Sequence, residues 1–139
     1  MRALLLHTTR FQSELIKPSN WPNGIEPETK KSTIEQMIEC LVCFFTVETN
    51  DSTKQINELH AEIIKAAQEV GTRNLVLSPF VHLSNNIAPP ATAKQLAAQL
   101  VSQFTDTSYT VTTSHFGYHK TLLLDIKGHP GSFRYREFN

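Results

Sequence analysis

The stretch Leu75-Val-Leu-Ser-Pro-Phe-Val-His-Leu-Ser-Asn-Asn86 begins as an apolar strand and turns polar after Pro79. A similar stretch, Phe116-Gly-Tyr-His-Lys120, follows later in the chain, and Lys127-Gly-His-Pro130 ends the strand after it. Ligands of α/β proteins usually bind where strands end, because the rigid sheet holds the polar side chains in place there. We therefore expect one site assembled from three strand ends.

Outward from this stretch, apolar periodicity predicts strands and helices over most of the chain. Strands are expected over residues 2–8, 38–48, 73–81, 109–114 and 121–126. Amphipathic helices are expected over residues 56–70, where Gly71 ends the apolar stripe, and over residues 91–104, which two prolines precede. This order favours a single α/β domain, residues 1–139, in which a mixed β-sheet packs against two main helices.

Residues 17–30 lie between the first two expected strands and contain Trp21, Gly24 and three prolines. Such a loop is long for so small a domain. It is either a lid or an interface next to a site, or a surface loop that the Trp21 side chain anchors to the protein. Both interpretations stay open at this point.

The composition is typical of a soluble globular domain, with 40% hydrophobic and 19% charged residues in a chain of 139. Thirteen basic residues balance thirteen acidic ones, so the formal net charge is zero. That balance disfavours broad binding along a nucleic-acid duplex, which depends on many phosphate contacts. Contact with one end of a nucleic acid is still compatible with it. The apolar run at residues 3–6 is too short for a signal sequence or a membrane span, and we expect a cytoplasmic protein.

Cys40 and Cys43 form a C-x-x-C pair inside an apolar run that is typical of a buried strand. Strand alternation places the two side chains on opposite faces, so a shared metal ion or a disulfide is not expected. We interpret them as buried free thiols.

Other signatures of catalytic chemistry are missing from the sequence. Among six histidines, His115 and His119 come nearest to a ligand pair, and we expect no metal site. No G-x-S-x-G elbow is present, and neither Ser78 nor Ser114 has the spacing that announces a nucleophile. With five glycines in the chain, no phosphate-binding glycine-rich loop is formed.

Lys120 and His82 are the candidates for chemistry at the strand ends. If residues 116–124 form one strand, Lys120 shares a face with Tyr118 and Leu122, while His119 points the opposite way. An ammonium group there can stabilise an oxyanion or contact a phosphate. A lysine at a strand end is, however, more often a solvated residue that protects an edge. His82 similarly either faces a site or caps a buried turn.

Four sequence blocks together resemble the N-terminal editing domain of archaeal threonyl-tRNA synthetases. The blocks are Met1-Arg-Ala-Leu-Leu-Leu-His7, Pro79-Phe-Val-His-Leu-Ser84 with Ala88-x-Pro90, Phe116-Gly-Tyr-x-Lys120, and Lys127-Gly-His-Pro130. Their order and spacing match across nearly the whole chain. The resemblance implies a D-aminoacyl-tRNA deacylase-like fold, a homodimer, no cofactor, and hydrolysis of L-serine wrongly attached to threonine tRNA. It also implies help from the terminal 2′-hydroxyl of the tRNA, whose acceptor end is the partner together with the remaining domains of a synthetase.

The resemblance also implies roles for individual residues. Lys120 matches a position near the reacting carbonyl and His82 one that shapes the pocket, and we take both as catalytic candidates. Expected substrate-binding positions are Pro79, Phe80, Val81, Tyr118 and His119.

Two positions depart from the family pattern. His119 stands where a second aromatic residue is usual, and Phe133 stands where an acidic residue is usual. Three functions therefore remain in view: a seryl-tRNA editor, a deacylase of D-aminoacyl-tRNA or of another mischarged tRNA, and an inactive module that binds the tRNA tip or dimerises. Phe133 favours the inactive module, whereas the retained His82, Tyr118 and Lys120 favour an enzyme.

Overall fold

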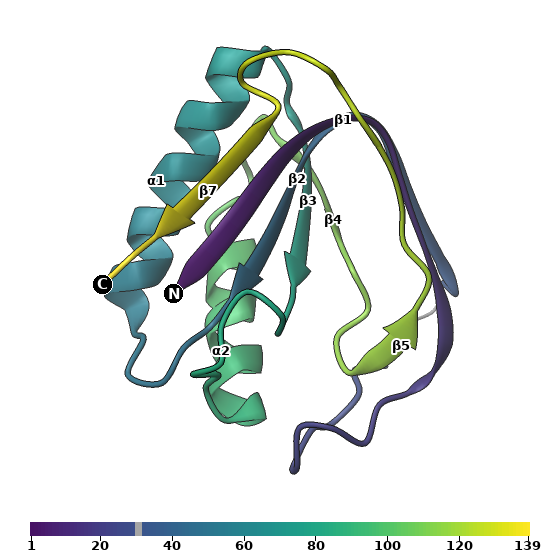
Figure 1. Ribbon diagram of the computed structural model, residues 1–139, viewed down its shortest axis with the longest axis vertical. Helices are drawn as coiled ribbons and strands as arrows, with labels where there is room; N and C mark the ends of the chain where they lie inside the picture. Colours follow the sequence, from purple (N-terminus) through teal and green to yellow (C-terminus); the bar gives the residue numbers. More distant parts are fainter. Residues whose placement is uncertain (30–31) are drawn as a thin grey trace.

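The structure, a computed structural model, describes residues 1–29 and 32–139. Within these residues the elements follow in the order β1 (Arg2–Pro18), β2 (Ile34–Thr46), α1 (Thr53–Val70), β3 (Asn74–Pro79), α2 (Pro90–Ser102), β4 (Thr110–Thr113), β5 (Tyr118–Lys120), β6 (Leu123–Ile126) and β7 (Phe133–Glu137). The expected class is confirmed: one α/β domain with a mixed, curled sheet and two helices (Figure 1).

The 17-residue strand β1 is the spine of the sheet. Along one edge it pairs antiparallel with β2, and β2, β3 and β4 continue the sheet in parallel. Along its other edge β1 pairs with three short strands laid end to end: β7 at residues 2–6, β6 at residues 8–12 and β5 at residues 15–18. The final third of the chain is therefore fixed to one long strand, and the residues of β5 lie at the far end of it (Figure 1).

Both helices begin and end where local chemistry favours it. Ser52 caps α1 through a capping box with Gln55, and Gly71 ends the helix in the left-handed conformation at φ 75°. Helix α2 has Pro90 in its first turn, where the missing N–H costs nothing. Neither helix is long and apolar enough to cross a membrane, in the part of the chain that the structure describes.

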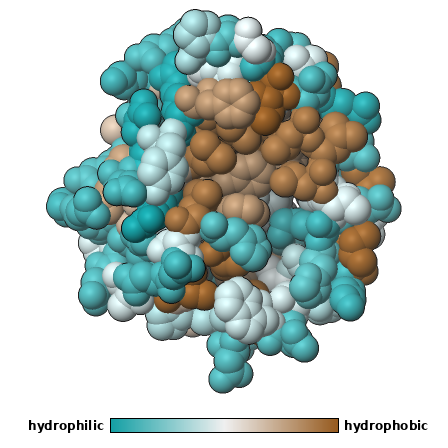
Figure 2. Space-filling view, viewed as in Figure 1, coloured by the Kyte–Doolittle hydropathy of each residue, from teal (hydrophilic) through white to brown (hydrophobic). Residues whose placement is uncertain are grey.

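The sheet separates two groups of buried apolar side chains. The larger group lies between the sheet and the helices and includes Leu5, Cys43 and Ile63. The smaller group lies on the opposite face and includes Leu6 and Cys40. The two cysteines are thus buried, free and in different groups, which confirms the expectation from alternation. Figure 2 shows apolar side chains gathered on the side of the sheet that carries no helix.

The elements differ from the sequence expectations in four places. Strand β1 continues ten residues beyond the expected strand 2–8, and its second half alternates buried residues such as Phe11 with exposed ones such as Arg10. Strand β7, of five residues, was not expected. The single strand expected near residues 116–124 is broken, because β5 ends at Lys120 and β6 begins at Leu123. The expected loop 17–30 begins later, after Pro18, and its last residue, Lys30, lies outside the described residues.

Candidate active site

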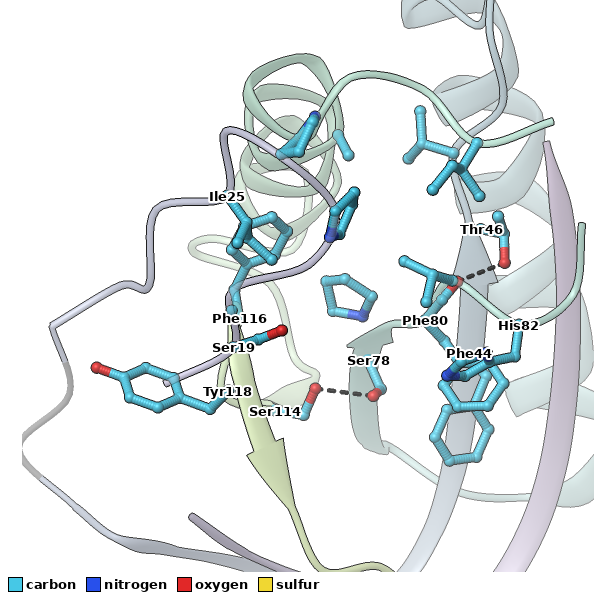
Figure 3. A pocket seen from close by; sticks show the side chains of 18 of the residues that line it. Ser19, Ile25, Phe44, Thr46, Ser78, Phe80, His82, Ser114, Phe116 and Tyr118 are labelled. Carbon is cyan, nitrogen blue, oxygen red and sulfur yellow. Dashed lines mark hydrogen bonds between the residues drawn. The ribbon is translucent and has the colours of Figure 1, made fainter. Parts of the chain in front are cut away.

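A cavity of about 340 Å³ opens where β3, the turn before β5 and the loop after β1 meet. Figure 3 shows Phe80, Phe44 and His82 on one side of it and Phe116, Ile25 and Ser19 on the other. All the site residues expected from the sequence line this cavity: Pro79, Phe80, Val81, His82, Tyr118, His119 and Lys120. Two of the three stretches expected to form the site, separated by almost forty residues in sequence, are therefore brought to one place. The expectation is wrong for the third stretch, because none of residues 127–130 is among those that line the cavity, and the His129 ring lies instead against His7, with 2.7 Å between their nitrogen atoms.

The wall that follows β3 is shaped by backbone hydrogen bonds. The Phe80 N–H donates to the Phe45 carbonyl at 2.8 Å, and the Thr46 hydroxyl donates to the Phe80 carbonyl. The same hydroxyl accepts the Leu83 N–H at 3.3 Å, so the chain turns sharply away from the sheet here. No hydrogen bond among the described residues uses the N–H groups of Val81 and His82. These two donors remain available to a ligand oxygen.

His82 contributes to this wall mainly by ring packing. Its ring meets Phe80 edge-on at a centroid distance of 5.0 Å, and Phe80 in turn packs on Phe44 at 5.1 Å. The residue as a whole is exposed. Contacts of this kind fix the shape of a pocket without committing the imidazole nitrogens to a partner inside the protein.

The opposite wall is a turn clamped by the loop after β1. Gly117 has φ 81°, and a Cβ at this position would lie 2.7 Å from the Pro27 Cα. Glu28 makes two hydrogen bonds to this turn, one on each side of Gly117. Its carboxylate accepts the Phe116 N–H and its backbone carbonyl accepts the Tyr118 hydroxyl, both at 2.8 Å. The Tyr118 hydroxyl therefore points away from the cavity (Figure 3).

The loop itself is part of the site. Ser19, Trp21, Pro22 and Ile25 line the cavity, and the Ser19 N–H donates to the Gly117 carbonyl at 2.8 Å. Of the two interpretations that the sequence left open, a loop bordering a site is therefore the correct one for its described part. Trp21 is 58% exposed and does not pin the loop to a core.

Lys120 is half-buried beneath this turn. Its ammonium group donates to the carbonyls of His115 at 3.0 Å and Tyr118 at 3.3 Å, which leaves one of its three N–H donors for another acceptor. Burial lowers the pKa of Lys120, and the negative charge of Glu28 opposes that shift. A partly desolvated ammonium with a spare donor is suited to stabilising an oxyanion.

Alternation within β5 is correct as far as the strand extends. Tyr118 and Lys120 are half-buried, and His119 between them is exposed, although it still borders the cavity. The expected continuous strand does not reach Leu122, because β5 ends before it, but Leu122, at 48% exposure, still borders the same cavity as Lys120. His115, considered above as a metal ligand, is fully buried with its Nε2 atom 2.7 Å from the Ser32 carbonyl oxygen.

Several residues that line the cavity were not assigned to the site from the sequence, and a pair of serines is the most informative of them. Ser78 on β3 and Ser114 after β4 are buried side by side, with 2.7 Å between their hydroxyl oxygens (Figure 3). Ser78 lies within the first recognised stretch and Ser114 just before the second, but their contact depends on the parallel register of β3 and β4. A single sequence carries no signal for that register. Phe133, in contrast, lies on β7 at 63% exposure and is not among the residues that line the cavity.

Comparison with known proteins gives consistent results. Residues 1–138 match the family model described as the archaea-specific editing domain of threonyl-tRNA synthetase. Among curated relatives, the threonine–tRNA ligase of Pyrococcus horikoshii is 34% identical over 134 residues, and that of Methanococcus maripaludis is 31% identical over 133 residues. Each alignment covers 94% of this chain but only 21% and 20% of the relative. The chain thus spans about a fifth of the length of these relatives.

A solved structure described as c-Myc DNA unwinding element binding protein superposes with a TM-score of 0.71 at 11% identity. The match covers 100% of this chain and 99% of that one. At this level of identity the likeness concerns the fold alone, and it confirms the expected D-aminoacyl-tRNA deacylase-like architecture.

Proposed function

Since the chain belongs to the archaea-specific editing-domain family of threonyl-tRNA synthetases, we propose that it hydrolyses the ester between L-serine and the terminal adenosine of threonine tRNA. The observation that carries this proposal is the convergence of Lys120, His82 and the free N–H groups after Phe80 on one cavity. The cavity accepts the aminoacyl end of a tRNA, and the rest of the tRNA lies outside it.

The chemistry is that of ester hydrolysis by water. As water attacks the carbonyl carbon, negative charge grows on the carbonyl oxygen, and the Lys120 ammonium stabilises that charge. The N–H groups of Val81 and His82 hold the aminoacyl group, while the rings of Phe80 and His82 shape the wall against which it lies. The terminal 2′-hydroxyl of the tRNA positions or activates the water, a role that the family resemblance implies. Because the tRNA supplies this group, the cavity needs few polar side chains of its own.

No protein nucleophile takes part in this proposal. Ser78 and Ser114 bond to each other, Ser19 bonds to the backbone of Trp21, and the Ser13 hydroxyl has no hydrogen-bond partner within residues 1–29 and 32–139. No base is within hydrogen-bond distance of these serines in the part of the chain that the structure describes, whereas a serine nucleophile needs one. Burial raises the pKa of the Cys43 thiol, and desolvation also raises that of Cys40, so neither is a thiolate at neutral pH.

Serine and threonine differ by one methyl group, and contact with a single methyl discriminates by only about 10–200-fold in a binding site. A second, smaller site that accepts serine and excludes threonine corrects the remaining errors. The aromatic walls of the cavity provide that exclusion, because an added methyl in a packed site costs about 1–3 kcal/mol.

The partners follow from the same proposal. They are the acceptor end of mischarged tRNA, the remaining domains of a synthetase, and a second copy of the chain, all in the cytoplasm. For the homodimer, the support is the exposure of Phe133 and Tyr135 on β7, opposite Leu6 and Leu4 of β1. Light scattering of the purified chain is expected to give twice the monomer mass, and a monomer at micromolar concentration would contradict the dimer.

One experiment tests the activity itself. Deacylation of L-seryl-, L-threonyl- and a D-aminoacyl-tRNA is measured in parallel on the same threonine tRNA. We expect L-seryl-tRNA to be hydrolysed fastest, by about tenfold or more over L-threonyl-tRNA. Equal rates on the two L-esters would exclude a threonine-system editor, and preference for the D-ester would indicate the related D-aminoacyl-tRNA activity. No hydrolysis of any ester would leave the inactive tRNA-tip module, the function that the exposed Phe133 favours.

A further inference from the structure

The buried hydroxyls of Ser78 and Ser114 are polar groups at the base of a largely apolar cavity. Figure 3 shows them between the Phe80 side and the Phe116 side of the cavity, joined by a hydrogen bond. Ser78 is 1% exposed and Ser114 is 2% exposed. Such slight exposure admits only a small group, which must approach from the cavity.

The hydrogen bonds of this pair are incomplete. Two hydroxyls carry two protons, and their mutual bond uses one of them. The other proton has no acceptor among the described residues, since each serine side chain takes part only in the bond to the other. Each hydroxyl thus has one partner, as buried polar atoms usually do, but a buried donor proton without an acceptor still costs free energy. A group that enters the cavity and accepts this proton removes that cost.

We propose that Ser78 and Ser114 form the subsite that recognises the side-chain hydroxyl of the aminoacyl group. This inference rests on the proposed function. It adds which residues make the site prefer aminoacyl groups that carry a side-chain hydroxyl. The seryl hydroxyl accepts the free proton of the pair and can donate its own proton to a lone pair of the other oxygen. A short hydroxymethyl group is small enough for so narrow an approach.

The pair separates amino acids with a hydroxyl from those without one. Serine and threonine both carry the hydroxyl, so the pair does not distinguish them, and the exclusion of threonine stays with the apolar walls. Alanine has the size of serine without the oxygen, and in its complex the pair keeps its unpaired proton. Sites built to bond a substrate hydroxyl reject the analogue that lacks it more strongly than apolar sites reject a methyl.

The test compares seryl and alanyl esters on the same threonine tRNA, with kcat/KM measured for each. The wild-type chain is expected to hydrolyse the seryl ester about tenfold or more faster than the alanyl ester. In the double variant Ser78→Ala/Ser114→Ala the ratio is expected to fall close to one, mainly through slower hydrolysis of the seryl ester. Ser102→Ala, which removes a hydroxyl bonded to the Gln99 carbonyl on α2, is the matched control and is expected to keep the wild-type ratio.

The double variant removes both partners of a buried hydrogen bond at once, a change that is often nearly neutral for stability. If its circular dichroism nevertheless shows loss of fold, the two single variants carry the test, and each is expected to lower the ratio. A wild-type ratio near one, or an unchanged ratio in folded variants, would overturn this inference while leaving the deacylase intact. Absence of hydrolysis of either ester by the wild type would overturn both.

Discussion

At the scale of single residues, the proposed chemistry depends most on Lys120. Its ammonium is held by two backbone carbonyls, one from His115 and one from Tyr118, so its position is fixed by the turn itself. A charged donor fixed in advance is more effective in a transition state than one that must reorganise. His82 packs on Phe80 and His119 is exposed, so neither is held in a comparable way.

Alanine substitutions of these three residues are expected to rank in that order. Lys120→Ala removes the stabilising charge and is expected to slow seryl-tRNA deacylation by about 10²–10³. His82→Ala opens one wall of the cavity and costs less, and His119→Ala costs least. The measurement is kcat/KM with circular dichroism as the check of folding. Normal activity of Lys120→Ala, or loss of activity confined to His119→Ala, would show that the chemistry lies elsewhere.

The pH dependence of deacylation reports on the same ammonium. Activity falls as pH rises through the pKa of Lys120, because only the charged form stabilises the oxyanion. Burial already lowers that pKa and Glu28 raises it, so Glu28→Gln is expected to move the alkaline loss of activity to lower pH. Glutamine can still accept the Phe116 N–H, which preserves the turn.

The control for this profile is Glu26→Gln, which removes an exposed carboxylate from the same loop. It is expected to leave the alkaline limb in place, after the spontaneous hydrolysis of the ester has been subtracted at each pH. A shift of the limb to higher pH in Glu28→Gln, or an equal shift in both variants, would argue against Lys120 as the titrating group.

At the scale of elements, the turn before β5 and the loop after β1 act as one unit. The turn and the loop pack tightly at Gly117, which has a positive φ and whose Cα faces the Pro27 backbone. Gly117→Ala is expected to lower the free energy of unfolding by about 1–3 kcal/mol through backbone strain, and to reduce activity because the wall moves. Urea denaturation provides the measurement.

Gly128→Ala is the matched control, because a Cβ at Gly128 meets nothing within 4 Å and its φ lies outside the left-handed region. It is expected to change the free energy of unfolding by no more than about 0.5 kcal/mol. If the two variants lose equal stability, the close packing of the turn against the loop is not a determinant of stability.

The elements also show what sequence patterns could and could not predict. The two helices were predictable because their apolar stripes, Gly71 and Pro90 are local signals. The second half of β1 was not predictable, because most of its residues are polar and they form no apolar run. Strand β5 has only three residues and is held by pairing with β1, which is a contact distant in sequence. The assumption of one continuous strand over residues 116–124 was therefore wrong, whereas alternation within β5 placed His119 correctly.

At the scale of the whole molecule, the long strand β1 brings the parts of the site together. Its far end holds β5 with Lys120, and its partner β2 holds β3, which ends at Pro79. Alternation and strand ends correctly predicted that the stretches after β3 and around β5 would meet, but wrongly added residues 127–130 to the same site. They did not predict the contact of Ser78 with Ser114 or the place of the loop, because both depend on register and on folding of the sheet as a whole.

The whole assembly is proposed to lack a protein nucleophile and to rely on Lys120 and on the tRNA itself. The most direct test is single-turnover release of serine from seryl-tRNA ending in adenosine, compared with the same seryl-tRNA ending in 2′-deoxyadenosine. We expect the 2′-deoxy substrate to be hydrolysed at least about 10²-fold more slowly, in line with the loss of one positioned catalytic group, and no acyl-enzyme to accumulate. Equal rates on the two substrates, or a trapped acyl-enzyme, would contradict the account.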